Sequence, residues 1–228
     1  MAGKDEGDDP CGVSPERHNE APIFTLLQVL EDLEPREAAL QMAVDKVLLE
    51  TTPLPILRFY RWAGPCVTIG YFQSLEKAVT QYPGLPVVRR WTGGGTVLHT
   101  EDAPYSLIVP RAEAFASVRP AESYRLVHGA LAHALRGAFP GVTTAQENAP
   151  QCSSSCFENP VTDDLLLGCV KVAGAGQRRT RAGLLHQGSI QVGSSNFPQA
   201  SDFASLLGSA IQPACLTQEV LERARLLL

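Results

Sequence analysis

Three consecutive glycines at positions 93–95 separate two apolar, strand-like runs within residues 87–109. Glycine loses more backbone entropy on folding than any other residue, so such a run is typical of positive φ angles or of a ligand lying against the main chain. A flexible hairpin loop is the simpler alternative. Because Arg89, Arg90 and His99 flank the glycines, we expect this stretch to line a binding cleft.

The composition describes one folded unit of moderate size. The chain has 228 residues, of which 44% are hydrophobic and 19% are charged, and its formal net charge is -5. We expect a polar, disordered tail over residues 1–21 and a single domain over residues 22–228, without a large accessory domain at the C-terminus. The acidic balance disfavours nucleic-acid binding, which usually leaves a basic stripe in the sequence.

The cysteines and the N-terminus bear on the compartment. Six cysteines are scattered without Cys-x-x-Cys spacing, and the N-terminal residues include no apolar segment. This pattern disfavours secretion and a zinc ribbon, so we predict a reduced, cytoplasmic protein with no bound metal. No apolar run approaches the roughly 20 residues that a membrane helix needs, so we expect no transmembrane helix.

The periodicity of apolar residues predicts an α+β fold, in which a mixed or antiparallel sheet packs against helices. Strands 56–62 and 66–72 are separated by a short turn and predict a hairpin. Gly70 interrupts the second of these strands and indicates a bulge or the close approach of a ligand. The remaining expected elements are helices over 35–49 and 121–139, strands near 170–172 and 183–192, and two short helices after residue 200, the second with Thr217 as its N-cap.

A long connection over residues 144–164 holds Cys152 and Cys156 among turn-forming residues. Loops of this length in a compact domain tend to be functional or disordered, and a cysteine on such a loop can reach solvent. Cys66 and Cys169 lie in apolar, strand-like settings instead, so we expect them to be buried as small hydrophobic residues. A nearby cation decides whether a loop cysteine is reactive.

Lys171 lies in an alternating stretch, opposite its neighbours Val170 and Val172. Its side chain points either to water or into a cleft. The small residues at 173–176, which include Gly174, leave room for something to lie close. A dinucleotide-binding fingerprint is disfavoured because Arg179 stands where a third glycine belongs and a strand is expected to follow.

Two segments carry a family resemblance. The run Arg-Arg-Trp-Thr-Gly-Gly-Gly-Thr-Val-Leu-His over residues 89–99 resembles a signature of the lipoate–protein ligase and octanoyltransferase family. Lys-Val-Ala-Gly-Ala-Gly-Gln-Arg-Arg from Lys171, followed by Leu-His-Gln-Gly-Ser-Ile around His186, is similar to the second signature in order and spacing. The resemblance covers about residues 22–200. It implies a biotin/lipoyl protein ligase-like catalytic domain, whose glycine loop packs against an acyl chain while Lys171 holds the acyl carbonyl.

The resemblance leaves two reactions open. Cys156 begins Cys-Phe-Glu-Asn-Pro, which resembles a motif of one octanoyltransferase branch in which that cysteine takes up the acyl group as a thioester. The stretch around Tyr71 and Gln73 is similar to the same branch. The third glycine of the loop, Gly95, is closer to the ligases, which use ATP and Mg²⁺. We expect octanoyl transfer without a cofactor, with ATP-dependent lipoate ligation as the alternative and a non-catalytic acyl-binding protein as a weaker one.

The resemblance also implies the partners and the site residues. The donor would be octanoyl-acyl carrier protein, or free lipoate for a ligase. The acceptor would be a lysine on a lipoyl domain of a 2-oxoacid dehydrogenase or on the carrier protein of glycine cleavage. Arg89 and Arg90 alternate in direction along a strand, so only one of them should line the site. The predicted catalytic residues are Cys156 and Lys171, and the predicted substrate-binding residues are Tyr71, Gln73, Arg89, Arg90, Gly93, Gly94, Gly95, His99, Gly174 and His186.

Overall fold

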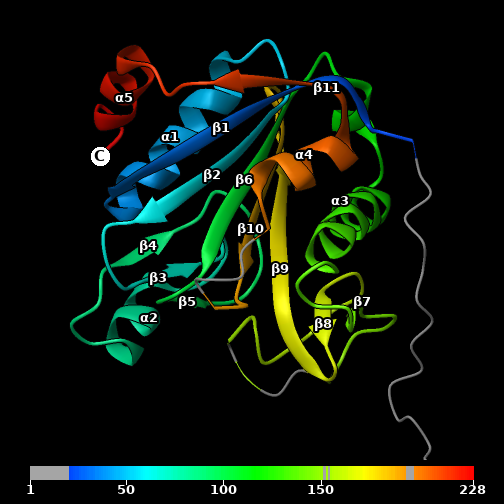
Figure 1. The fold of residues 1–228 in the computed structure, drawn as a ribbon. Helices are drawn as coiled ribbons and strands as arrows, with labels where there is room; N and C mark the ends of the chain where they lie inside the picture. Colours follow the sequence, from blue (N-terminus) through cyan, green and yellow to red (C-terminus); the bar gives the residue numbers. More distant parts are fainter. Residues whose placement is uncertain (1–20, 151–152, 154, 194–197) are drawn as a thin grey trace, which may run out of the picture.

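A computed structural model describes residues 21–150, 153, 155–193 and 198–228 (Figure 1). The tail predicted over residues 1–21 lies outside the described residues except for its last position, and Cys152 also lies outside them. Eight strands form a mixed sheet in the order β11-β1-β2-β6-β10-β9-β8-β7, and β4-β3-β5 form a second, smaller sheet. The large sheet contains β1 Phe24–Arg36, β2 Ile56–Trp62, β6 Ala103–Pro110, β7 Val142–Thr144, β8 Leu165–Leu167, β9 Val170–Arg179, β10 Gly183–Ile190 and β11 Gly208–Ala214.

The small sheet and the helices complete the fold. The small sheet contains β3 Cys66–Ile69, β4 Val87–Arg89 and β5 Val97–His99. The helices are α1 Ala38–Thr51, α2 Leu75–Gln81, α3 Pro120–Leu135, α4 Ala200–Leu207 and α5 Gln218–Arg225, with a short 3₁₀ helix at Ala114–Ser117. None of the helices in the described part of the chain is long and apolar enough to cross a membrane.

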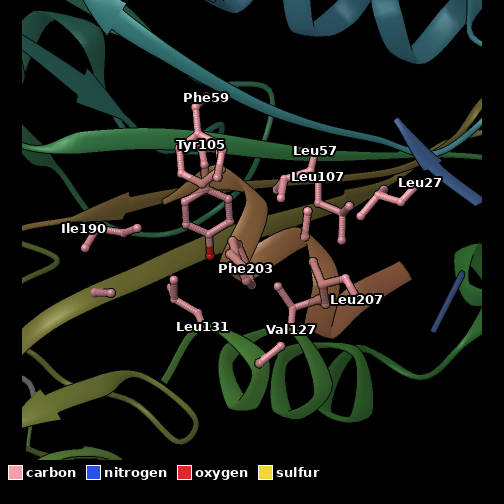
Figure 2. Close-up of a cluster of buried hydrophobic side chains, with 14 of the residues drawn as sticks. Leu27, Leu57, Phe59, Tyr105, Leu107, Val127, Leu131, Ile190, Phe203 and Leu207 are labelled. Atoms are coloured by element: carbon pink, nitrogen blue, oxygen red, sulfur yellow. The ribbon is translucent and has the colours of Figure 1, made fainter. Parts of the chain in front are cut away.

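The central strands are buried on both faces, because helices cover the large sheet on each side (Figure 1). Alternation along β2 sends Leu57 into the core under α3 and α4, while Ile56 enters the core under α1. Figure 2 shows the first of these cores, where the Tyr105 ring packs edge-on against Phe203 with 5.6 Å between centroids. Every residue of β6 and of β10 is buried. Neither strand therefore alternates between apolar and polar residues, and the polar residues within them belong to the site.

The α+β class predicted from the sequence is confirmed, but several elements differ. Residues 24–36 form strand β1, which the sequence analysis missed, so the first helix begins at Ala38 rather than at Pro35. Proline is tolerated there because β11 pairs with β1 only as far as Leu30, which leaves the end of β1 without that neighbour. A second unpredicted strand, β11, separates the two short C-terminal helices and runs parallel to β1. The predicted N-cap of the last helix, Thr217, accepts a hydrogen bond from the Val220 N–H.

The predicted hairpin is wrong. Strand β2 belongs to the large sheet and β3 to the small one, so residues 63–65 connect two sheets instead of two paired strands. β3 ends at Ile69, before Gly70, because the chain turns there to meet the glycine loop. Cys66 is buried as expected, whereas Cys169 is exposed, because the β8–β9 turn at Gly168 carries it out to solvent.

Candidate active site

The glycine loop, residues 93–95, connects β4 to β5 and packs backbone against backbone on two sides. Of its residues, Gly94 alone has a positive φ, 99°. A Cβ at Gly70 would lie 2.0 Å from the Gly94 carbonyl oxygen, and a Cβ at Gly176 would lie 2.6 Å from the Gly93 carbonyl oxygen. The absence of a side chain at Gly70 therefore makes room for the glycine loop, and not for the ligand that its position in the sequence suggested.

The two arginines contact different segments, and both hold backbone. Arg90 is 8% exposed and donates through Nη2 to the carbonyls of Gly93 and Gly95, at 3.0 and 2.8 Å. Its Nη1 donates to the backbone and hydroxyl oxygens of Thr68. Burial lowers the pKa of the Arg90 guanidinium. Arg89 points the other way and donates to the Tyr71 carbonyl oxygen at 2.7 Å. Arg90 thus fixes the shape of the loop.

The turn at residues 70–73 joins this loop to the rest of the site. The Gln73 side chain accepts from the Gly70 N–H at 2.8 Å and donates to the Thr96 hydroxyl at 3.1 Å. The Tyr71 N–H donates to the Thr92 carbonyl oxygen at 2.9 Å. Gln73 therefore links the turn to the strand that follows the glycines, and Tyr71 is exposed beside it.

His99 is buried in a hydrogen-bonded chain at the end of β5. Its Nδ1 lies 2.6 Å from Asp102 Oδ2, and its Nε2 lies 2.8 Å from the Thr68 hydroxyl. Asp102 also accepts from the Ser189 hydroxyl at 2.7 Å. The ring of His99 packs against Trp62 with 4.6 Å between centroids. These contacts hold one wall of a narrow cavity.

Lys171, Asp164 and Cys156 meet at the start of β9. The Lys171 Nζ lies 2.6 Å from Asp164 Oδ2, 3.1 Å from the Cys156 carbonyl oxygen and 3.4 Å from Cys156 Sγ. Lys171 is 4% exposed, so its side chain points into the cleft and not into water. A Cβ at Gly174 would lie 2.5 Å from Lys171 Cε, so only glycine leaves room for this ion pair. The Cys156 N–H donates to the Thr96 carbonyl oxygen at 2.8 Å, which ties the cysteine to the strand after the glycines.

Two cavities adjoin at Cys156. A wide one of about 540 Å³ is lined by the glycine loop, Cys156, Asp164, Lys171 and Tyr124. A narrow one of about 30 Å³, room for one water molecule, runs between Cys156 and a mostly apolar wall that includes Met42, Tyr60, Trp62 and Val97. Gly94 and Gly176 line both cavities. The arrangement places a thiol and a cation at the junction of an open cleft and an apolar slot.

His186 lies behind Gln177 in the wall of the wide cavity. It is completely buried, 3.1 Å from the Tyr105 hydroxyl and 2.9 Å from the Gln177 amide nitrogen, and Gln177 lines the wide cavity. Burial and the neighbouring His128 lower the pKa of His186 well below its ordinary value. Burial also lowers the pKa of His128. Both rings are therefore neutral near pH 7, and His186 supports the cavity wall through Gln177.

Sequence reasoning missed several polar residues that hold the site. Asp164 was overlooked because an acid in a loop gives no sign of its partner. Thr92 was also overlooked; its hydroxyl donates to Gln187 at 3.0 Å, and Gln187 donates to Asp45 at 2.8 Å. Asp45 forms an ion pair of 2.6 Å with the fully buried Arg58. For Asp45 and Gln187 the available signal was a polar residue inside a predicted helix or strand. Within the described residues, His, Cys, Asp and Glu form no group that could hold a metal ion.

Comparisons with known proteins relate the chain to one family of catalytic domains. The model of the lipoyl protein ligase A/B catalytic domain matches residues 37–220. An octanoyltransferase LipM from Anoxybacillus flavithermus is 36% identical over 170 residues, which cover 67% of this chain and 60% of that protein. An octanoyltransferase LipM from Moorella thermoacetica is 32% identical over 204 residues, which cover 80% of this chain and 74% of that protein.

A solved structure has the same fold. The putative lipoate protein ligase Ta0514 from T. acidophilum, with bound lipoic acid, superposes with a TM-score of 0.64 at 20% identity, covering 90% of this chain and 94% of that chain. This likeness confirms the expected ligase-like architecture. Because the family model spans residues 37–220, the chain belongs to the lipoyl protein ligase A/B catalytic-domain family.

Proposed function

We propose that this protein transfers an octanoyl group from a carrier-protein thioester to a lysine of a lipoyl-carrier domain. The observation that carries the proposal is the position of Cys156, whose sulfur lies 3.4 Å from the Lys171 ammonium where the wide cleft meets the apolar slot. A thiol beside a cation in a partly exposed setting is the usual arrangement of a reactive cysteine. The similarity to two octanoyltransferases supports the same reaction.

The first step would load the enzyme. The Cys156 sulfur attacks the carbonyl carbon of the octanoyl thioester, a new carbon–sulfur bond forms, and the bond to the donor sulfur breaks. The donor leaves as a thiol after taking up the proton that Cys156 gave up. One thioester replaces another of similar energy, so no ATP is needed. Lys171 would stabilise the negative charge that develops on the carbonyl oxygen.

The second step would modify the acceptor. The neutral amine of the target lysine attacks the same carbonyl carbon, an amide bond forms, and the bond to Cys156 Sγ breaks. The proton lost by the amine returns to the cysteine thiolate. A thiol-dependent route of this kind fits a reducing compartment such as the cytoplasm. The octanoyl chain would lie in the wide cleft, where the glycines at 94 and 176 leave no side chain in the way.

Intact-protein mass spectrometry tests the proposal. Incubation with octanoyl-acyl carrier protein, without ATP, should add one octanoyl group to the wild-type chain, and Cys156→Ser should give neither this thioester nor a modified lipoyl domain. Cys169→Ser is the matched control, because Cys169 is an exposed cysteine on the β8–β9 turn, and it should behave like wild type. If Cys156→Ser still modifies a lipoyl domain when given lipoate, ATP and Mg²⁺, the protein is a ligase and the transferase proposal is wrong.

A further inference from the structure

A fixed turn beside the glycine loop exposes a large apolar side chain. Phe72 is 91% exposed. Its turn is held in place on both sides, because Arg89 donates to the Tyr71 carbonyl oxygen at 2.7 Å and the Tyr71 N–H donates to the Thr92 carbonyl oxygen at 2.9 Å. A single exposed apolar residue is ordinary, whereas a contiguous exposed patch marks an interaction surface, so the neighbours of Phe72 decide its meaning.

Cations and aromatic rings continue this surface. The Arg178 guanidinium lies 4.0 Å from the centre of the Tyr71 ring, and its Nη1 donates to the Trp91 carbonyl oxygen at 3.2 Å. The Lys46 ammonium lies 4.7 Å from the centre of the Trp91 ring. The Tyr71 and Phe72 rings meet edge to face, with 5.2 Å between centroids. We call these five residues the aromatic–basic patch: Lys46, Tyr71, Phe72, Trp91 and Arg178.

The composition of the patch is that of a protein interface. Tyr, Trp, Phe and Arg are the residues enriched at the centres of interfaces and among the side chains that dominate binding energy. Stacking on aromatic rings keeps the Arg178 and Lys46 charges in place. The patch therefore combines an exposed apolar anchor with fixed positive charge, although the chain as a whole has a formal net charge of -5.

A short series of contacts joins the patch to Cys156. The turn that carries Phe72 continues into Gln73, whose side chain donates to the Thr96 hydroxyl at 3.1 Å. The Thr96 carbonyl oxygen accepts from the Cys156 N–H at 2.8 Å. A protein seated on the patch would lie next to the strand that holds the reactive sulfur.

We propose that the aromatic–basic patch docks the acceptor domain, through an acidic surface around its target lysine. This rests on the proposed transferase function. The reach of the substrates favours the acceptor over the donor, because a lysine side chain has only four methylene groups and its domain must sit against the mouth of the site. The positive charges of Arg178 and Lys46 would attract the acidic surface and orient it, while Phe72 fills an apolar contact.

Kinetics of the two half-reactions test the docking site. Phe72→Asp should raise the KM for the lipoyl domain at least tenfold and leave the rate at which octanoyl-acyl carrier protein loads Cys156 unchanged. Leu226→Asp is the matched control, because Leu226 is an apolar residue just beyond α5 that is 85% exposed and is not part of the patch, and both half-reactions should remain as in wild type. Arg178→Gln should weaken the salt dependence of the acceptor KM.

An unchanged acceptor KM in Phe72→Asp would overturn the docking site. If loading of Cys156 is slower in the same variant, the patch would be assigned to the donor. A direct titration of the lipoyl domain against wild type and Phe72→Asp, followed by fluorescence, separates this proposal from the reaction itself. If wild type never forms the octanoyl thioester, the proposed function fails, whereas equal Kd values for the two proteins would refute the docking site alone.

Discussion

Lys171 and Asp164 form a buried ion pair in which Nζ lies 2.6 Å from Oδ2, and both side chains are almost completely shielded from water. The dehydration of two charges offsets most of their attraction, so such a pair adds little net stability. It does fix the ammonium in one position, 3.4 Å from Cys156 Sγ. The pair therefore orders the site more than it stabilises the fold.

Asp164→Asn should destabilise the protein, because it leaves the Lys171 charge buried without its counter-charge. Breaking one side of a buried pair costs about 3 kcal/mol. Urea denaturation followed by circular dichroism measures the change. The double variant with Lys171→Met and Asp164→Leu removes both charges and should be less destabilised than Asp164→Asn. If the double variant is less stable than Asp164→Asn, this explanation is wrong.

Lys171→Ala should remove most of the octanoyl-transfer activity, by roughly a hundredfold or about 3 kcal/mol of transition-state stabilisation. The ammonium is the cation nearest to Cys156 Sγ among the contacts of this site. Because alanine leaves the Asp164 carboxylate unpaired, activity should be compared at a temperature where circular dichroism shows the variant to be folded. Single-turnover loading of Cys156 is the measurement, and a loading rate within threefold of wild type would refute the role.

Arg90→Lys should impair the enzyme more than Arg89→Lys. The Arg90 guanidinium reaches two loop carbonyls and Thr68 at once, which a single ammonium cannot do, whereas Arg89 holds the turn before α2. Hydrogen bonds from a charged donor are worth about 1.5–3 kcal/mol each, so Arg90→Lys should also be less stable. Paired kcat/KM and urea denaturation measurements check both points. Equal losses in the two variants would rule out this division.

Gly70→Ala should be much more harmful than Gly93→Ala. The added Cβ at position 70 would lie 2.0 Å from the Gly94 carbonyl oxygen and must push the loop away, while a Cβ at Gly93 meets no atom within 4 Å. Neither glycine has a positive φ, so the contrast isolates packing from backbone strain. Transfer rates of the two variants give the comparison, and wild-type activity in Gly70→Ala would show that the loop tolerates displacement.

Stability should fall as the pH drops below about 6.5, the ordinary pKa of histidine. Burial lowers the pKa of His186 and His128 in the folded protein, so the unfolded chain binds more protons than the folded one below this pH. Each such histidine removes up to about 1.4 kcal/mol per pH unit. Above pH 6.5 their contribution is fully present. Denaturation midpoints between pH 5 and 8 should show the slope, and His186→Gln should reduce it.

The sequence alone determined the class of the fold and the local elements with strong patterns. The apolar period of α3, the alternation of β9 and the N-cap Thr217 are properties of neighbouring residues, so they can be read without the fold. The two signatures also sufficed to indicate the family. Strand β1 could not be found in this way, because its solvent-facing and buried positions do not alternate regularly.

The tertiary structure alone decided which residues meet. The sequence left open whether the Lys171 side chain faces water or a cleft. The answer depended on Asp164 and Cys156, which come from a loop that gives no periodic signal. Gly70 fits against Gly94 only because β3 joins the second sheet instead of pairing with β2. Contacts between residues distant in the chain depend on the register and crossing of strands, which local propensity does not encode. For that reason the sequence supplied the chemical groups of the site, and the packing of two sheets set their geometry.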